Sequence, residues 1–317
     1  VNIRFNPITE EAYNQWVSMQ GKNRYIITIL GRKLTARQIA GVTRIVADQD
    51  MNIDDIKRLT GRIPLDENAR TPKASVEFSV RGTPRDKEQM KADFMKLSAE
   101  QEMDISFQEE SMYRRMRRLI CFDMDSTLIE TEVIDELAIR AGVGDQVKAI
   151  TEAAMRGEID FCESFRQRCA LLKGLDVSVM QEIAENLPIT EGVERLMYVL
   201  KKYGYKIAIL SGGFTYFGQY LQKKYGIDYV YANELEIIDG KLTGRYLGDV
   251  VDGKRKAELL RLIAQVEKVD IAQTIAVGDG ANDLPMLGVA GLGIAFHAKP
   301  KVVANAKQSI NTIGLDG

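Results

Sequence analysis

The sequence predicts two folded parts: a ferredoxin-like α+β domain, then an α/β domain with a Rossmann-like parallel sheet and a helical cap insertion. Residues 24–108 show strand and helix patterns in the order β-α-β-β-α-β. Residues 119–317 instead alternate short apolar strands with amphipathic helices, which is typical of parallel βαβ units. A chain of 317 residues is also long enough for about two domains.

The elements of the first part follow from local periodicity. Strand patterns are rich in β-branched residues or alternate in polarity, and helix patterns place apolar residues three and four apart. Because the alternating strands leave only one face for helices, we expect a two-layer domain. The expected strands are 24–31, 52–59, 74–81 and 104–107, and the expected helices are 34–49 and 86–101.

The second part has five apolar strand candidates and one long helical insertion after the first of them. An Asp-Gly turn inside 235–247 predicts an additional β-hairpin. The expected strands are 119–122, 206–210, 229–231, 274–277 and 293–296. The expected domains are an N-terminal arm over 1–23, a ferredoxin-like domain over 24–110, an α/β core over 111–131 and 188–317, and a helical cap over 132–187.

Composition excludes several classes of protein. With 45% hydrophobic and 28% charged residues, the chain can bury a core and is not a disordered chain. A net charge of −2 gives no basic excess, so we expect no nucleic-acid partner. The sequence lacks a run of about 18 apolar residues, so we expect no membrane partner. Three cysteines do not suit a disulfide framework and favour a reducing, cytoplasmic location.

The clearest chemical signal is the pair Asp123 and Asp125, which directly follows the strand 119–122. In open α/β sheets, ligands bind beyond the carboxyl ends of the strands. Two neighbouring carboxyl groups repel, so the pKa of one should rise. One can then act as a nucleophile and the other as a general acid and base. The alternative is that these residues only cap a helix.

A second acidic pair follows a later strand. Asp279 and Asp283 lie in AVGDGANDLPM, directly after the strand 274–277. Carboxylate oxygens from two strand ends suit Mg²⁺, which prefers hard oxygen ligands. The alternative is a tight turn followed by a helix cap. Taken with the first pair, the sequence predicts a magnesium site.

Two further motifs suit a phosphate group. Ser211 and Gly212 in ILSGGF offer a hydroxyl and backbone amides at the start of a helix. Lys256 in GKRKAELLRLI could neutralise a phosphoryl group during its transfer. On spacing alone, Lys254 and Arg255 are equally good candidates for that role.

These four motifs, in this order, resemble the haloacid dehalogenase-like hydrolase superfamily and, within it, the phosphoserine phosphatase family. P-type ATPases share the first aspartate but continue with Lys-Thr-Gly-Thr, whereas this chain has Asp125, which favours a phosphatase. The resemblance covers residues 113–310 and implies a further closing helix after SINTIGLDG. The matching segments are FDMDSTLIETEVIDELA (122–138), FCESFRQRCALLKGL (161–175), LSGGF (210–214) and VGDGANDLPML (277–287).

The resemblance implies a role for each matching residue. Asp123 would be the nucleophile that forms an aspartyl phosphate, and Asp125 the acid and base. The implied Mg²⁺ ligands are the carboxylates of Asp123 and Asp279 and the backbone carbonyl of Asp125, with Asp283 supporting metal-bound waters. The implied phosphate-binding residues are Ser211, Gly212 and Lys256, with Asn282 nearby.

The cap carries the expected substrate contacts. Arg168 can clamp a carboxylate with two hydrogen bonds, and Glu132 can accept hydrogen bonds from an ammonium group. Phe161 is seven residues before Arg168, which places both on one face if 161–172 is helical. The resemblance implies that Phe161 closes over the substrate and that Met155 lies in the cap site. The alternatives are a surface arginine and a phenylalanine of the cap core.

The implied reaction is the Mg²⁺-dependent hydrolysis of O-phospho-L-serine to L-serine and phosphate, the last step of serine biosynthesis. One alternative is a related phosphatase or phosphotransferase acting on another phospho-amino acid. The other is an amino-acid sensor whose phosphatase half is vestigial. The intact catalytic motifs favour an enzyme over the sensor.

The first part also has a family resemblance. The segment ILGRKLTARQIAGVTRIVADQDMNI, together with the element order, resembles an ACT domain. Such domains often bind amino acids at domain interfaces and regulate attached enzymes. A dimerising or structural module without a ligand is an equal alternative. A homodimer through the ACT-like domain is therefore one expectation.

Overall fold

The computed structural model describes Thr9 and residues 23–60 and 73–317. The expected arm over 1–23 therefore lies almost entirely outside the described residues. The chain divides into two compact units, Val1–Met112 and Tyr113–Gly317. Each unit is described by itself.

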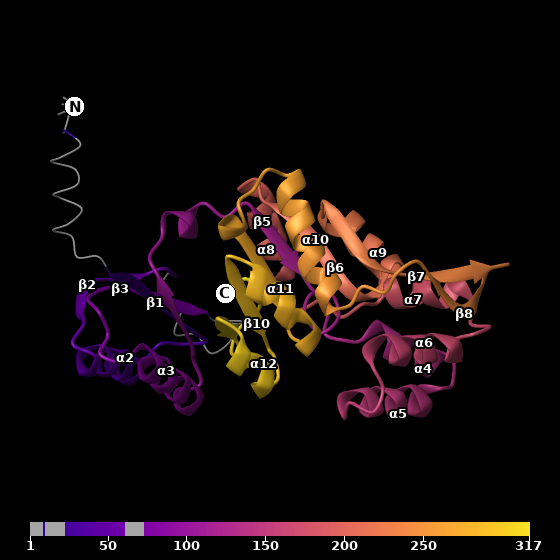
Figure 1. Ribbon diagram of the computed structural model, residues 1–317, viewed down its shortest axis with the longest axis horizontal. Helices are drawn as coiled ribbons and strands as arrows, with labels where there is room; N and C mark the ends of the chain where they lie inside the picture. The colour runs from indigo at the N-terminus through magenta and orange to yellow at the C-terminus, as the bar shows by residue number, and fades with distance from the viewer. Residues whose placement is uncertain (1–8, 10–22, 61–72) are drawn as a thin grey trace, which may run out of the picture. The chain divides into compact units, whose positions relative to one another are not determined.

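The described residues of the first unit form a four-stranded antiparallel sheet with two α-helices (Figure 1). The strand order β2-β3-β1-β4 is ferredoxin-like and confirms the predicted α+β fold. The side chains of Thr35 and Asp86 cap α2 and α3, which explains where these helices begin. The elements are β1 Arg24–Gly31, α2 Ala36–Asp48, β2 Asn52–Arg58, β3 Ala74–Arg81, α3 Lys87–Gln101 and β4 Asp104–Glu109.

The core of this unit forms because alternate strand residues point toward the helices. Ile27, Ile29 and Phe78 are fully buried and belong to one apolar cluster with Val42 of α2 and Phe94 of α3. Burial of this kind stabilises by about 1.5–3 kcal/mol for each large side chain. The period-two pattern therefore fixes which face of the sheet the helices cover.

The second unit is built on a seven-stranded sheet with the order β11-β10-β9-β5-β6-β7-β8. All its strand pairs are parallel except β7 with β8, which form the predicted hairpin. The strands are β5 Leu119–Phe122, β6 Lys206–Phe214, β7 Tyr229–Ile238, β8 Lys241–Leu247, β9 Thr274–Gly278, β10 Leu292–Phe296 and β11 Gln308–Ile310. The α-helices outside the insertion are α8 Val193–Lys202, α9 Thr215–Tyr225, α10 Gly253–Val266, α11 Leu284–Val289 and α12 Pro300–Asn305, and the 3-10 turns are η1 Met112–Arg115, η2 Ile271–Gln273 and η3 Ala281–Asp283.

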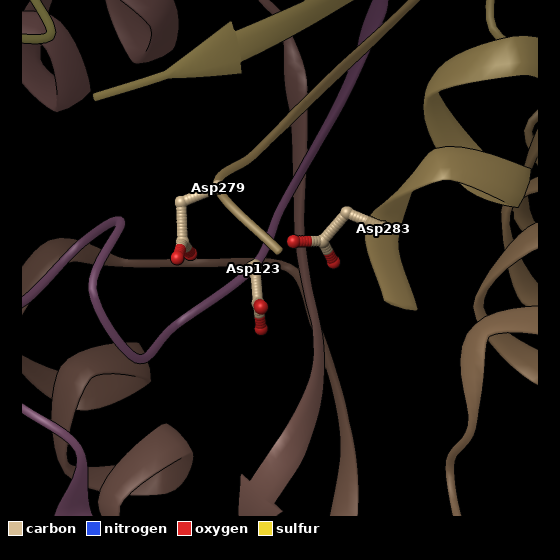
Figure 2. A group of neighbouring side chains, drawn as sticks. All are labelled: Asp123, Asp279 and Asp283. Carbon is tan, nitrogen blue, oxygen red and sulfur yellow. The ribbon is translucent and has the colours of Figure 1, made fainter. Parts of the chain in front are cut away.

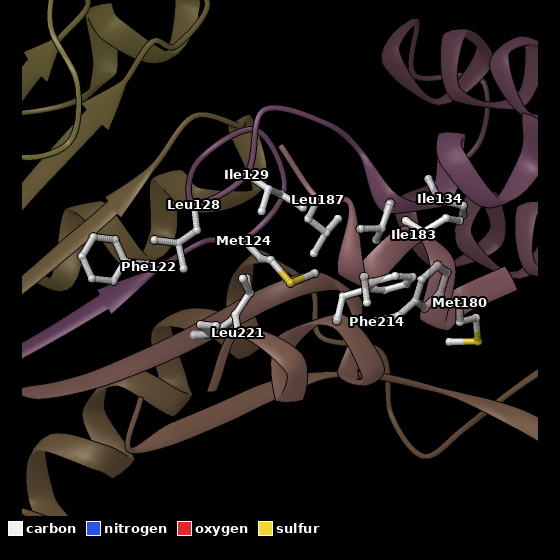
Figure 3. Close-up of a cluster of buried hydrophobic side chains, with 14 of the residues drawn as sticks. Phe122, Met124, Leu128, Ile129, Ile134, Met180, Ile183, Leu187, Phe214 and Leu221 are labelled. Carbon is white, nitrogen blue, oxygen red and sulfur yellow. The ribbon is translucent and has the colours of Figure 1, made fainter. Parts of the chain in front are cut away.

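Helices cover both faces of this sheet, so its central strands are apolar on both sides. In β5, Leu119 and Cys121 pack in a cluster with helices α10 and α11. Ile120 and Phe122 pack in the opposite cluster, which includes residues of α8 and α9. The same cluster includes residues of the inserted helices, and Figure 3 shows some of them, Ile134, Met180 and Ile183, together with Phe122 of β5. The buried run 119–122 therefore fixes β5 at the centre of the sheet.

The insertion consists of four helices between β5 and α8, as the sequence predicts for the cap. They are α4 Val133–Arg140, α5 Gly144–Met155, α6 Phe161–Leu171 and α7 Val177–Glu185. The two chain segments that join the insertion to the core pair with each other as an antiparallel bridge. The amide of Glu130 donates to the carbonyl of Pro188 at 2.8 Å, and the amide of Thr190 donates to the carbonyl of Leu128 at 3.1 Å.

Strand order determines where the site lies. Parallel strands β6 and β9 flank β5 on its two sides. Their carboxyl ends therefore meet at one edge of the sheet, where α/β proteins bind ligands.

Among the described residues, no helix is long and apolar enough to cross a membrane.

Candidate active site

The site begins at Asp123, which directly follows β5. Its amide donates to the carbonyl of Val277 at 2.9 Å, so the ladder between β5 and β9 extends to this residue. One carboxylate oxygen accepts from the amide of Met124 at 2.7 Å, and the other lies 3.0 Å from the Lys256 ammonium. Only 6% of the residue is exposed. Asp123 is thus a fixed carboxylate with one oxygen oriented by backbone and one by a cation.

Three carboxylates form a cluster at the carboxyl ends of β5 and β9. Oxygens of Asp123, Asp279 and Asp283 lie within 4.8 Å of one another (Figure 2). Burial first, and then the charge of Asp283, raise the pKa of Asp123 to about 8 and that of Asp279 to about 7. A site that crowds hard oxygen ligands and disfavours their charge is suited to a divalent cation.

Hydrogen bonds hold the other two carboxylates of this cluster. The hydroxyl of Thr127 donates to Asp279 at 3.1 Å, and the amide of Gly280 donates to Asp283 at 2.9 Å. Thr127 and Asp283 are fully buried. Thr127 was not singled out in the sequence, although it belongs to the motif DMDST.

Of the three neighbouring basic residues Lys254, Arg255 and Lys256, only Lys256 lies among the carboxylates. Its ammonium is 2.7 Å from Asp283 as well as 3.0 Å from Asp123, and the residue is fully buried. Burial lowers its pKa, but the two carboxylates outweigh burial and raise it. Lys254 and Arg255 are instead exposed and lie near Glu258 on the helix surface. Their positions leave Lys256 as the cation of the site.

Asp125 lies between the core and the cap. One carboxylate oxygen accepts from the amide of Val133, the first residue of α4, at 3.0 Å. Burial first, and then the charges of Glu132 and Asp123, raise its pKa well above the ordinary value. A protonated carboxyl group at this position can donate a proton to a leaving oxygen.

Residues 211–213, which bulge from the ladder near the end of β6, lie directly against Asp125. Gly213 has no Cβ, and a Cβ built there would be 2.2 Å from the second oxygen of Asp125. Only glycine allows this close approach. The Gly213 amide donates to the hydroxyl of buried Ser211 at 2.9 Å, which orients that side chain. The structure therefore brings Ser211, Gly212 and Gly213 to the same site as the two aspartates.

The cap reaches this loop through Phe161. A Cβ built on Gly212 would lie 3.2 Å from the Phe161 ring and 3.7 Å from the amide nitrogen of Asn282. Phe161 also stacks on Phe165, with ring centroids 6.3 Å apart. Three predicted site residues, Phe161, Gly212 and Asn282, are thus neighbours, although they come from the cap and from two core loops.

The two charged cap residues lie near Asp125. Glu132 is exposed and accepts from the hydroxyl of Ser126 at 2.8 Å. Burial lowers the pKa of Arg168, while the charges of Glu132, Asp135 and Asp125 act in the opposite direction. The side chain of Met155, at the end of α5, lies outside the described residues.

Besides Thr127, two further residues of this region escaped the sequence interpretation. Ser126 adopts a left-handed conformation with φ of 54°, which is uncommon for a residue other than glycine and places its hydroxyl on Glu132. Asn233 is buried in β7 and contacts two loops of the site. Asn233 lies beyond the expected strand 229–231, although β7 continues to Ile238, and because asparagine is depleted in strands no local signal pointed to it.

Comparisons with known proteins agree with this arrangement. A scan against protein families identifies a haloacid dehalogenase-like hydrolase over residues 117–291 and an ACT domain over 24–108. A phosphoserine phosphatase of Streptomyces coelicolor is 42% identical over 297 residues, covering 94% of this chain and 70% of the relative.

Solved structures give the same result. An unliganded probable phosphoserine phosphatase of Vibrio cholerae superimposes with a TM-score of 0.72 at 36% identity, covering 92% of this chain and 84% of that one. A substrate-bound phosphoserine phosphatase complex superimposes with a TM-score of 0.58 at 44% identity, covering 62% of this chain and 93% of that one. The likeness therefore includes the catalytic unit and, for the longer matches, most of the chain.

Proposed function

We propose a function from one premise: the chain belongs to the haloacid dehalogenase-like hydrolases and, within them, to the phosphoserine phosphatase family. It is a phosphatase that hydrolyses O-phospho-L-serine to L-serine and phosphate. The observation that carries this function is the buried ammonium of Lys256 between Asp123 and Asp283, with Asp125 on the adjoining loop.

Asp123 is the proposed nucleophile. Its carboxylate attacks phosphorus, the bond from phosphorus to the serine oxygen breaks, and an aspartyl phosphate forms. The ammonium of Lys256, 3.0 Å away, stabilises the charge on the phosphoryl oxygens. Ser211 and the Gly212 loop hold the phosphate, with Asn282 beside them. The burial of Asp123 keeps bulk water away from the reacting atoms.

Asp125 is the proposed acid and base. Burial and the neighbouring carboxylates raise its pKa, which favours the protonated form that can give a proton to the serine oxygen as that oxygen leaves. The resulting carboxylate then takes a proton from the water that attacks the aspartyl phosphate. Serine and phosphate are released, and Asp123 and Asp125 return to their starting states.

Mg²⁺ is the proposed cofactor, because the cluster of Asp123, Asp279 and Asp283 offers only hard oxygen ligands. Asp123 and Asp279 would hold it with carboxylates and Asp125 with its backbone carbonyl, while Asp283 would support its waters. When bound, Mg²⁺ would offset the negative charge of the phosphate and carboxylates.

Substrate selection is assigned to the cap. Arg168 would bind the carboxylate of phosphoserine and Glu132 its ammonium, and Phe161 would close over the bound amino acid. Met155 belongs to the same proposed site. The charge of Glu132 acts on both Arg168 and Asp125, which supports placing the amino-acid part of the substrate between cap and core.

The test is phosphate release from O-phospho-L-serine with Mg²⁺ and with a chelator, beside O-phospho-L-threonine. We expect magnesium-dependent release that favours phosphoserine. Release from other esters but not from phosphoserine would contradict the assignment of the cap residues. Absence of release from every ester would contradict the phosphatase function.

A homodimer through the ACT-like domain and a cytoplasmic location are further proposals. The match of residues 24–108 to an ACT domain supports the first, since the sequence predicts a dimerising module there. The free thiols of Cys121, Cys162 and Cys169 support a reducing compartment. Light scattering on the full chain would measure the oligomeric state. A monomer at micromolar concentration would contradict the dimer.

A further inference from the structure

We propose that Asn233 is a positioning residue that sets the geometry of both phosphate-binding groups, the loop 211–213 and the start of α10. This inference rests on the proposed phosphatase function. Asn233 is 1% exposed and belongs to β7, not to any of the motifs that carry the chemistry. A buried amide needs partners for its donor and its acceptor, and here both partners belong to the site.

The first partner is the loop at the end of β6. In the ladder between β6 and β7, Leu210 pairs with Tyr231 and Phe214 pairs with Asn233. The β6 segment is therefore two residues longer than its partner, and 211–213 bulge out of the ladder. The side-chain amide of Asn233 donates to the carbonyl of Gly212 at 2.8 Å. A side chain thus replaces the ladder hydrogen bond that the bulge removes.

The second partner is the segment that leads into α10. The Asn233 side-chain oxygen accepts from the amide of Val251 at 2.8 Å. Asp252 caps the helix, and Lys256 lies in its first turn. Because Gly212 offers a carbonyl and Val251 an amide hydrogen, only one orientation of the Asn233 amide satisfies both. The Asn233 side chain therefore connects residues 211–213, by two hydrogen bonds, to the segment that begins the helix carrying Lys256.

The space around residues 212 and 213 is too small for the backbone there to move without displacing its neighbours. Gly213 approaches Asp125 so closely that a Cβ there would be 2.2 Å from its carboxylate. A Cβ built on Gly212 would likewise lie only 3.2 Å from the Phe161 ring. If the Gly212 peptide turned, the loop would displace the acid and base residue and the phosphate together. A displacement of about 1 Å at a reacting centre can cost about a hundredfold in rate.

The experiment compares Asn233→Ala and Asn233→Asp with a matched control, Thr274→Val, in the full chain with saturating Mg²⁺. Thr274 is also fully buried and also bridges two backbone groups, accepting from Gly291 at 3.2 Å and donating to Ile271 at 2.7 Å. It begins β9, at the opposite end of the sheet from the site. The measured quantities are kcat, KM, the inhibition constant of inorganic phosphate and the melting temperature.

Asn233→Asp keeps an acceptor for Val251 but places an acceptor against the Gly212 carbonyl. Asn233→Ala removes both bonds without adding charge, so agreement between the two variants excludes simple repulsion of phosphate. We expect kcat to fall about 10- to 100-fold and the phosphate inhibition constant to rise about tenfold in both. In Thr274→Val, we expect the melting temperature to fall, while kcat and the phosphate inhibition constant stay within about twofold of wild type.

Hydrogen exchange gives a readout that does not depend on turnover. We expect faster amide exchange in both 211–214 and 250–256 in the Asn233 variants, and no change there in Thr274→Val. Kinetic constants within about twofold of wild type, or unchanged exchange in these segments, would overturn the proposal even if the melting temperature fell. If Asn233→Ala does not fold, the kinetic constants and the hydrogen exchange of Asn233→Asp test the proposal by the same criteria.

The failure of this proposal and of the proposed function are distinguishable. A wild-type chain without activity on O-phospho-L-serine would refute the function. Phosphate binding and hydrogen exchange would still test whether Asn233 positions the two loops.

Discussion

Replacing Lys256 with methionine removes the positive charge of the site while keeping the length and burial of the side chain. The ammonium lies 3.0 Å from Asp123 and 2.7 Å from Asp283 and is fully buried. Removing one partner of a buried ion pair costs about 3–5 kcal/mol, because the remaining charges have no compensation. At about 2–4 °C for each kcal/mol, the melting temperature of metal-free Lys256→Met should fall by about 10 °C.

Activity should fall further than stability alone explains. Removing one preorganised charge-stabilising group typically lowers kcat about 10²- to 10³-fold. We therefore expect at least this loss in phosphate release from O-phospho-L-serine, measured below the melting temperature with saturating Mg²⁺. Lys254→Met is the matched control, because Lys254 lies on the same helix but is exposed. It should change neither quantity.

A double variant separates the two effects. Asp283→Asn added to Lys256→Met removes one of the carboxylates that lost its cation, so part of the melting temperature should return. The lost activity should not return, because the reaction still lacks the ammonium. A Lys256→Met protein with wild-type kcat and an unchanged melting temperature would refute both the ion-pair and the charge-stabilisation arguments.

Three further outcomes are expected. Asp123→Asn should abolish turnover but leave the circular dichroism spectrum unchanged. A variant as active as the wild type would exclude Asp123 as the nucleophile. Gly213→Ala should lower kcat about tenfold or more by pushing against Asp125, whose carboxylate would lie 2.2 Å from the new Cβ, and an unchanged kcat would exclude the close approach. Because burial raises the pKa of Asp123 to about 8 and of Asp279 to about 7, from an ordinary value of 3.8, the folded state holds protons that the unfolded chain has lost, so the stability of the metal-free protein should fall as the pH rises from about 4 to about 8. Thermal melts should show that Mg²⁺ stabilises more at the higher pH, and a metal effect independent of pH would contradict this.

The parts of the fold and site that could be predicted follow from short-range patterns. The run 119–122 is apolar because both faces of β5 are covered, and that run alone places Asp123 at the carboxyl end of a central strand. The same reasoning applies to Asp279 after β9. The predicted ferredoxin-like and parallel-sheet folds are confirmed, since alternating and continuous apolar strands differ visibly in sequence. The assigned roles of the site residues stay predictions.

The parts that were missed depend on distant partners. β6 was expected to end at residue 210, but it continues to Phe214 because β7 and the side chain of Asn233 hold the Ser-Gly-Gly segment. Serine and glycine have little strand propensity, so nothing local indicates this continuation. β11 has only three residues and depends on its parallel pairing with β10. The local pattern alone did not separate Lys256 from Lys254 and Arg255. The family resemblance selected Lys256, and its burial in the structure gives the physical reason.

The paired segments that join the cap to the core make the insertion an exchangeable module. Glu130 and Pro188 are hydrogen-bonded across the pair, so the chain leaves and re-enters the core at adjacent points. An insertion of any internal design can span these points if its own ends lie one strand spacing apart. The sheet and the aspartates that follow β5 and β9 belong to the core, whereas the amide that holds Asp125 and part of the apolar cluster belong to the insertion, so a replacement must keep these contacts. Specificity can therefore diversify by replacing one contiguous stretch of sequence, while the chemistry stays under separate selection.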